Sequence, residues 1–385
     1  MLQPFRWTAR DRASIGTWLQ MVYADAGRLR QRRGLMVTKT NSGNFFEDFK
    51  LGQVIRHATP RTVTSGDVAV YNGLFGPRFA VQSADSFAEK AGYARAPLDD
   101  LLVFHVVFGK TVPDISLNAI ANLGYADCHF LKPVYPGATL SAVSEVIGLK
   151  ENSNKKTGIV YVRSRGLDQD GATVLDYVRW VMVKKRDENA PAPPEVVPTL
   201  PDSAEVGSLG NGCPIINNAG YDVELSGSPF RHGDYKVGEK IDHLVGITVE
   251  DAEHMIATRL YQNTARIHFD HFTERKGRFG QRLIYGGHAI SLARALSFNG
   301  LGNAFHIAAI NGGRHVAPLM AGATVFAWSE ILESAELHGR EDVGALRIRT
   351  VATKDMPCDG FPYKIGKEYD PAVILDLDYW VLMPR

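Results

Sequence analysis

The sequence of 385 residues contains an internal repeat, and this repeat limits its possible folds more than any other feature. The pair Thr62-Val63 recurs as Thr248-Val249 at an offset of 186 residues, and Gly137-Ala138-Thr139 recurs as Gly322-Ala323-Thr324 at an offset of 185. A later match, Trp180-Val181 with Trp380-Val381, has an offset of 200 and places an insertion of 15 residues in the second copy. Because one hydrophobic core rarely grows beyond ~250 to 300 residues, we predict two copies of one domain.

The repeat and the composition divide the chain into four parts. They are an N-terminal extension expected to be disordered (1–43), a first copy (44–185), a Pro/Gly-rich connector of extended character (186–232) and a second copy (233–385). The first 35 residues are rich in arginine, which is typical of a transit peptide. The alternative, an upstream extension before the polar start at Met36, is favoured.

Each copy has the same order of predicted elements. An apolar helix spans about Asp100 to Lys110 in the first copy and Gly287 to Asn299 in the second. Three alternating strands then close each copy: Ala138 to Ile147, Gly158 to Ser164 and Val174 to Val183, and later Thr324 to Ile331, Ala345 to Val351 and Ala372 to Leu382. Helices early and strands late predict an α+β fold, in which two antiparallel sheets are each wrapped around an apolar helix.

Composition excludes several kinds of partner. Lys plus Arg number 43 and Asp plus Glu number 42, so the net charge of +1 provides no global field for nucleic acid or an anionic membrane. No run approaches the ~20 apolar residues of a membrane span. Cys128, Cys213 and Cys358 lie far apart, which argues against a zinc ribbon or a disulfide framework. We therefore predict a cytoplasmic protein with no nucleic-acid or membrane partner.

Candidate catalytic residues occur in the second copy. His268 can act as an acid or a base near neutral pH, and Asn263, five residues earlier, can orient a water molecule. Gly286-Gly287 opens the apolar helix, where free backbone N–H groups and the positive helix end can stabilise an oxyanion. This set suits the addition of water to the activated double bond of a thioester. A structural histidine and a simple turn are the alternative, which spacing alone leaves open.

The segment Asn263-Thr-Ala-Arg-Ile-His268-Phe-Asp270 resembles the Asp-x-Asn-Pro-x-His-x-Asp motif of the MaoC-like, or hydratase-2, branch of the hotdog fold. It matches the length of that motif, its His and its final Asp. Phe279, Leu283-Ile284 and Gly286 then match a Phe, an aliphatic pair and a glycine of the family. The resemblance covers roughly Asn44 to Arg385 without the connector, and it implies a double hotdog whose two copies imitate the usual dimer.

The resemblance implies that His268 is the acid/base group and that the N–H of Gly286 forms the oxyanion hole. The family has Asp where this chain has Asn263. Either His268 acts alone on a water oriented by Asn263, or Asp270 or the substrate itself assists.

Long stretches of both copies are further similar to one subgroup, the mesaconyl-CoA hydratases, or β-methylmalyl-CoA dehydratases. This similarity implies a hydro-lyase that reversibly hydrates an acyl-CoA substrate, mesaconyl-CoA, to β-methylmalyl-CoA with no metal or other cofactor. A hotdog acyl-CoA thioesterase and a non-catalytic acyl-CoA-binding protein are the alternatives.

The carboxylate of such a substrate is costly to bury unpaired, so the pocket should present a cation to it. Arg266, two residues before His268, and Arg282 are the candidates, although both could be surface charges. Asp270 and Tyr285 complete the predicted substrate-binding set. A homo-oligomer is expected, with a homodimer favoured.

The first copy lacks this set of residues. Pro77, Gln82 and Asp100 stand at the positions of Asn263, His268 and Gly286. We therefore predict one working site per chain, with the first copy supporting the fold and shaping the acyl pocket.

Overall fold

The strands of the two copies join into one antiparallel sheet with the order β1-β3-β4-β5-β2-β8-β13-β10-β9-β6, and β7 pairs with β9 beside this path. The first copy supplies β1 (Val54–Thr62), β2 (Ala119–Phe130), β3 (Thr139–Glu151), β4 (Thr157–Leu167) and β5 (Thr173–Lys184). The second supplies β6 (Lys240–Asp242), β7 (Ile247–Thr248), β8 (His306–His315), β9 (Thr324–Leu337), β10 (Arg340–Lys354) and β13 (Val373–Pro384), with the small hairpin β11 (Lys364–Ile365) and β12 (Glu368–Tyr369) in its insertion. This computed structural model describes residues 39–385, and residues 43–385 form one unit.

The strand order of the second copy is the reverse of that of the first, and the copies meet where β2 pairs with β8. At this junction Tyr125 lies opposite Gly313 and His129 opposite Ala309. The pairing satisfies two strand edges that would otherwise be open. The predicted double hotdog is confirmed, and its two sheets are continuous.

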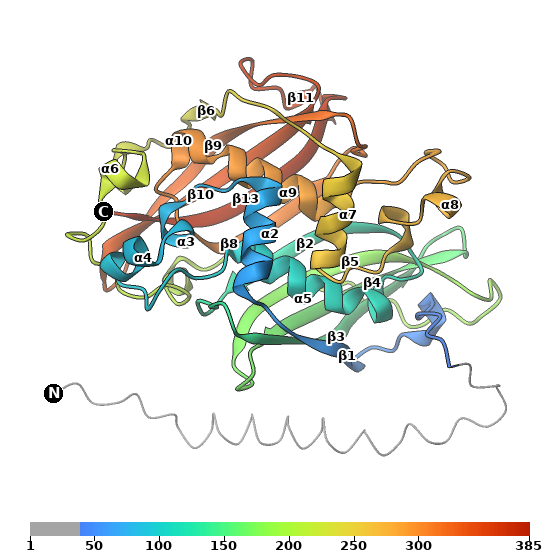
Figure 1. Cartoon of the computed structure of the whole chain (residues 1–385). Helices are drawn as coiled ribbons and strands as arrows, with labels where there is room; N and C mark the ends of the chain where they lie inside the picture. The colour runs from blue at the N-terminus through green and yellow to red at the C-terminus, as the bar shows by residue number, and fades with distance from the viewer. Residues whose placement is uncertain (1–38) are drawn as a thin grey trace. The chain divides into compact units, whose positions relative to one another are not determined.

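The two apolar helices, α5 (Asp100–Ile115) and α9 (Gly286–Leu296), lie on the same face of the sheet (Figure 1). Every residue from Leu101 to Val112 is buried, because the sheet curves around α5 and α9 packs beside it. A hydrogen bond of 2.9 Å between His105 Nε2 and Ser291 Oγ joins the two helices. His105 is thus a hydrogen-bonded histidine of the core.

Two further helices, α2 (Ser65–Phe75) and α7 (Asp251–Leu260), pack against each other, and α2 also contacts α9 (Figure 1). Thr64 caps α2 by accepting the Asp67 N–H at 3.3 Å, and the Asp67 carboxylate accepts the Thr64 N–H at 2.7 Å. This reciprocal cap explains where the helix begins. The shorter helices are α3 (Ala80–Ser83), α4 (Asp85–Ala91), α6 (Val223–Ser226), α8 (His271–Glu274) and α10 (Phe298–Leu301).

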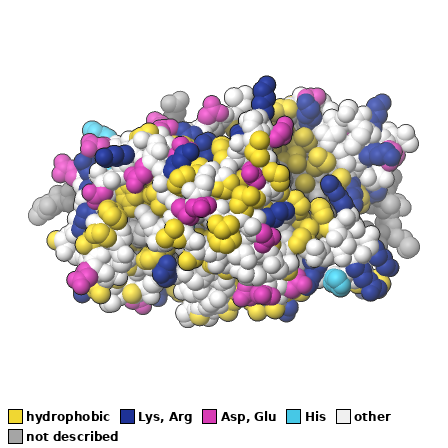
Figure 2. Space-filling model, turned by 90° about the horizontal axis from the view of Figure 1, so that it is seen from above, with side chains coloured by type: hydrophobic (Ala, Val, Ile, Leu, Met, Phe, Trp, Pro, Cys, Tyr) yellow, Lys and Arg dark blue, Asp and Glu magenta, His cyan; other side chains and the backbone are white. Residues whose placement is uncertain are grey.

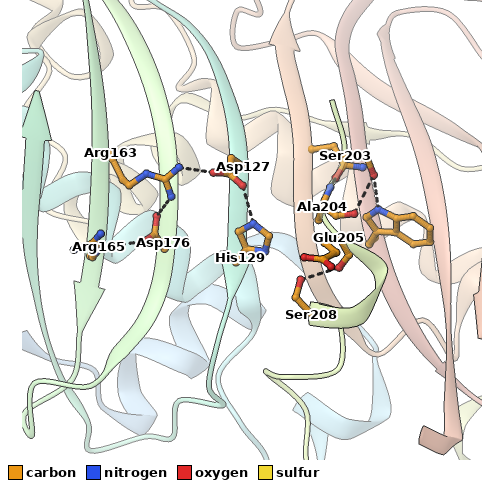
Figure 3. A network of polar contacts seen from close by, with 11 residues as sticks. Asp127, His129, Arg163, Arg165, Asp176, Ser203, Ala204, Glu205 and Ser208 are labelled. Carbon is orange, nitrogen blue, oxygen red and sulfur yellow. Dashed lines mark hydrogen bonds and ion pairs between the residues drawn. The ribbon is translucent and has the colours of Figure 1, made fainter. Parts of the chain in front are cut away.

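The connector, residues 186–232, does more than bridge the copies. Leu209, Ile216 and Tyr221 are buried against the face of β13 and β10 that is turned away from α9. Ser203 Oγ accepts the indole N–H of Trp380 at 3.0 Å, beside the strands in Figure 3. The backbone here is mostly irregular, and the scattered apolar residues of the connector cover an apolar face of the sheet.

The corresponding outer face of the first copy is polar instead. Arg163 pairs with Asp127 and with Asp176, and His129 Nε2 lies 2.8 Å from Asp127 Oδ1 (Figure 3). Seen from above the view of Figure 1, acidic and basic side chains are interspersed over another face of the molecule (Figure 2), in keeping with the net charge of +1. No helix among residues 39–385 is long and apolar enough to cross a membrane.

Candidate active site

A cavity of about 390 Å³ lies between the two copies. Its walls combine side chains of α5, β2 and β5 with those of the loop before α9 and the end of β8. The polar and aromatic groups that line it are Phe108, Ser116, Asn122, Tyr125 and Arg179 from the first copy and Asn263, His268, Arg278, Tyr285 and His315 from the second. Gly286 also lines it.

His268 is held with one ring nitrogen fixed. It ends a short 3-10 turn, Arg266–His268, and its Nδ1 lies 2.9 Å from the carbonyl oxygen of Leu283. Because a carbonyl only accepts, Nδ1 carries the proton and Nε2 keeps a lone pair. Burial lowers the pKa of His268 to about 4, so the ring is neutral at pH 7. His268 therefore has the properties of a general base.

Asn263 is also held with one end of its side chain fixed. Its Oδ1 accepts the Ala265 N–H at 3.0 Å, which leaves the amide N–H groups to bind a ligand or water. The loop that carries it packs tightly on α5 at Gly109, where a Cβ would lie 1.9 Å from the carbonyl oxygen of Tyr261. Only a glycine permits this approach. Asn263 can donate to a water oxygen but cannot take its proton.

Gly286 is the first residue of α9, where backbone N–H groups point out of the helix. The preceding N–H, that of Tyr285, is already used, since it donates to His254 Nε2 at 2.8 Å. A Cβ at Gly286 would lie 2.4 Å from His315 Nε2, so the imidazole of His315 rests directly on the glycine. This Nε2 is buried and has no hydrogen-bond partner within residues 39–385. The helix start thus offers a positive end and an adjacent, unpaired ring nitrogen.

Tyr285 lines the cavity with its ring, but its hydroxyl points into the core, 3.3 Å from His105 Nδ1. Its ring centroid lies 5.5 Å from that of His268 and 5.7 Å from that of Phe108. Tyr285 can contact an acyl group through its ring face.

The other three predicted substrate-binding residues lie outside this cavity. Arg266 is exposed, because residues two apart on a 3-10 turn face different directions, and His268 faces inward. Arg282 pairs with Asp251 at 2.9 Å. Asp270 caps α8 by accepting the Thr273 N–H at 3.1 Å. The structure therefore brings together Asn263, His268, Gly286 and Tyr285, and it does not bring Arg266, Arg282 or Asp270 to them.

Arg179 and His315 line the cavity although the sequence analysis did not select them. A signal for Arg179 exists. It lies on the same face of its strand as Tyr177 and Val181, two residues to either side, and both of these face the core. A charged residue at such an inward position calls for an explanation. His315 has no local signal, since only the fold brings the end of β8 against Gly286.

The first copy has a cavity at the corresponding place, but this one is nearly closed and has a volume of about 10 Å³. Asp100 stands where the working copy has Gly286, and its carboxylate lies 3.0 Å from His306 Nδ1 and accepts the Ile307 N–H at 2.8 Å. Gln82, at the position of His268, donates to the carbonyl oxygen of Phe305 at 2.6 Å. Asp100 and Gln82 thus bind residues 305–307 of the second copy, which leaves no room for a ligand.

The fold is that of the MaoC-like hotdog proteins. The model of the family described as mesaconyl-CoA hydratase matches residues 32–358. The chain belongs to this family.

Two curated relatives match over most of their length. The chain is 63% identical to the β-methylmalyl-CoA dehydratase of Chloroflexus aurantiacus, over 91% of this chain and 99% of that protein. It is 56% identical to the mesaconyl-CoA hydratase of Cereibacter sphaeroides, over 90% of this chain and 100% of that protein.

Solved structures agree on the fold. A MaoC domain dehydratase from Chloroflexus aurantiacus has a TM-score of 0.89 at 63% identity, with 90% of this chain and 99% of that chain covered. Rv0216 of Mycobacterium tuberculosis, described as a double hotdog, has a TM-score of 0.67 at 25% identity, with 89% and 99% covered.

Proposed function

We propose that this chain is a hydro-lyase that adds water reversibly to mesaconyl-CoA and forms β-methylmalyl-CoA. The names of the two curated relatives support the reaction and its substrate. The observation that supports it best in this chain is the fixed ring of His268: its Nδ1–H is held by Leu283, so Nε2 is left as the basic atom beside the cavity.

The proposed step begins with a water molecule whose oxygen accepts an N–H from Asn263. His268 Nε2 takes one proton of this water while the water oxygen bonds to the β-carbon of the enoyl thioester. The electron pair of the double bond moves toward the thioester carbonyl, and the negative charge on its oxygen is stabilised by the Gly286 N–H and the positive end of α9.

His268 then returns the proton to the α-carbon, which completes the addition. One water is consumed, and no oxidant or reductant is required. Asp270, the alternative assisting group, has its carboxylate engaged in capping α8, so it does not enter this scheme.

The experiment supplies purified protein with mesaconyl-CoA and follows the ultraviolet absorbance of the enoyl thioester together with free CoA thiol. Loss of absorbance without release of thiol is the expected result. Release of thiol would identify the thioesterase alternative instead, and no change in either signal would identify an acyl-CoA-binding protein. The cytoplasmic location and the homodimer stay predictions, and sedimentation velocity of the purified protein tests the latter.

A further inference from the structure

Arg179 is a fully buried guanidinium beside the cavity. It lies on β5 directly opposite Tyr125 of β2 and faces α5. Its Nη2 donates to Thr111 Oγ1 at 2.8 Å, and Ser116 Oγ lies 3.4 Å from both Nη1 and Nη2. Its Cζ lies 4.3 Å from the ring centroid of Phe108. These neighbours orient the guanidinium, but all of them are neutral.

Within residues 39–385 no carboxylate contacts Arg179, which distinguishes it from three other arginines of the sheet. Arg163, Arg347 and Arg349 each contact an aspartate or a glutamate. Within residues 39–385, the hydrogen bonds of Arg179 go only to hydroxyl groups, and its Nε is buried with no partner. Because a guanidinium remains charged in proteins, an uncompensated one is costly to bury. Such a cost is offset when a ligand brings the anion.

Asn122 is a second unsatisfied group of the same cavity. Its Nδ2 and Oδ1 are both buried, and neither has a hydrogen-bond partner within residues 39–385. Buried side-chain polar atoms are nearly always paired in a folded protein. A guanidinium without a counter-ion and an amide without a hydrogen bond, both at one cavity, therefore indicate a place for a polar ligand rather than ordinary core packing.

We propose that Arg179, with Asn122 beside it, binds the distal carboxylate of the acyl group and so selects α,β-unsaturated thioesters that carry a carboxylate on the β-carbon. The inference rests on the proposed function for the identity of the reaction. In mesaconyl-CoA this carboxylate is bonded to the carbon that receives the hydroxyl group, so its binding site must be close to the base.

The ring contacts meet this requirement. Phe108 lies against the guanidinium of Arg179 on one side, and its centroid is 5.7 Å from that of Tyr285, which in turn is 5.5 Å from that of His268. The cation and the base therefore border the same space across two aromatic rings. In the second copy, Tyr379 occupies the position of Arg179, and its hydroxyl bonds to Thr350 Oγ1 at 2.9 Å. The cation is thus found at the open cavity and not at the corresponding position in the other copy.

The test compares mesaconyl-CoA with tiglyl-CoA, in which a methyl group replaces the distal carboxylate. Both binding, by isothermal titration calorimetry, and kcat/KM are measured for the wild-type chain and for Arg179→Met. The wild type should prefer mesaconyl-CoA, and Arg179→Met should reduce this preference roughly 10- to 100-fold, the range for a lost hydrogen bond to a charged group. Arg179→Lys, which keeps the charge without the planar fork, should retain an intermediate preference.

Arg266→Met and Arg282→Met provide the rival comparison, since the sequence alone favours these two arginines as carboxylate partners. Both variants should keep the wild-type preference, because both side chains lie outside the cavity. A changed preference in either of them, or an unchanged preference in Arg179→Met, would overturn the proposal.

The folded stability of Arg179→Met provides a second measurement. Removal of an unpaired buried charge should not lower the midpoint of thermal unfolding, whereas a purely structural arginine would lower it. If this variant does not fold, the preference of Arg179→Lys decides: a preference equal to the wild type would contradict the proposal, and a reduced one would support it. A wild-type chain that binds mesaconyl-CoA preferentially but does not hydrate it would refute the proposed function and leave this subsite standing.

Discussion

The two copies in this chain have diverged at the same place in the fold, the start of the central helix. In the second copy α9 begins with Gly286 beside a cavity of about 390 Å³, whereas in the first copy α5 begins with Asp100 beside one of about 10 Å³. Gly286 has no side chain that could close the cavity, and the His315 imidazole lies against it. In the first copy the carboxylate of Asp100 fills the corresponding place and binds His306 and the backbone of Ile307.

This difference shows how one copy can lose a site and still serve the other. The first copy contributes Phe108, Tyr125 and Arg179 to the walls of the working cavity. Its own helix start is occupied by the carboxylate of Asp100, which contacts His306. A single-chain double hotdog therefore permits one half to specialise in chemistry and the other in substrate shape and charge, which identical subunits of a dimer could not do separately.

The largest expected difference between the copies is catalytic. His268→Ala should lower kcat by ~10² to 10⁴-fold, because the only neutral imidazole with a fixed Nδ1–H in the predicted motif is removed. The matched change Gln82→Ala, at the corresponding position of the first copy, should barely alter kcat. Both variants are assayed with mesaconyl-CoA, and far-ultraviolet circular dichroism checks their folding. Similar losses in the two variants would contradict the assignment of one working site per chain.

The second expected difference is the response to acid. His268 and His315 line the working cavity, and His288 lies two residues after Gly286 on α9. Burial lowers the pKa of each to about 4. Between pH ~6.5 and 4 the unfolded chain binds protons that the folded chain does not, so the free energy of unfolding should fall as the pH falls, by up to about 1.4 kcal/mol per pH unit for each group. Asp99, whose pKa burial raises to about 6, acts in the opposite direction. It is one group against these three and against His105, His243 and His254, whose pKa values burial also lowers.

Urea unfolding between pH 7.5 and 5 measures this slope. The first copy supplies the control, because it has Leu102 at the position of His288. His288→Leu should reduce the slope of the free energy of unfolding against pH by the contribution of about one proton, up to about 1.4 kcal/mol per pH unit. A slope that is flat in the wild type, or equal in the two proteins, would show that these histidines are not neutral in the folded chain.

The comparison between copies also shows what the sequence could and could not predict. The sequence predicts the two central helices, α5 and α9, to within about five residues at each end, because apolar runs such as Leu101 to Phe108 are typical of the core. The strands β3, β4 and β5 were predicted for the same kind of reason, from regular alternation. The sequence does not predict β2 and β8, through which the copies join. Their Gly- and Ala-rich sequences have weak strand propensity, and pairing across the junction stabilises them.

The candidate site divides along the same line. Asn263, His268 and Gly286 belong to one local motif, so a linear pattern was enough to bring them forward. Arg179 comes from the other copy. It reaches the cavity only because β5, which carries it, packs against α5 at Thr111. Arg266 is favoured from the sequence as the partner of the substrate carboxylate because it lies within the motif, but its side chain is exposed. Residue roles that depend on the contact between copies are not readable from either copy alone.

A smaller effect should come from the closed site of the first copy. Asp100→Asn keeps an oxygen to accept the Ile307 N–H but removes the charge that faces His306. The free energy of unfolding should fall by about 1 to 3 kcal/mol, and kcat of the folded enzyme should not change. Chemical denaturation measures the first quantity, with the exposed Asp170→Asn as the control. A loss of kcat at full stability would show that the closed site takes part in the reaction.

The smallest effect concerns Asn263, the residue that sets this chain apart from the motif it resembles. Its amide is expected to orient a water and not to exchange a proton, so Asn263→Ala should cost only the neutral hydrogen bond, about 0.5 to 1.5 kcal/mol, or a ~2- to 10-fold drop in kcat. Pro77→Ala, at the corresponding position of the first copy, should leave kcat unchanged. Steady-state assays with mesaconyl-CoA across pH measure this effect. If kcat of Asn263→Ala falls as far as that of His268→Ala, Asn263 does more than orient water and His268 does not act alone.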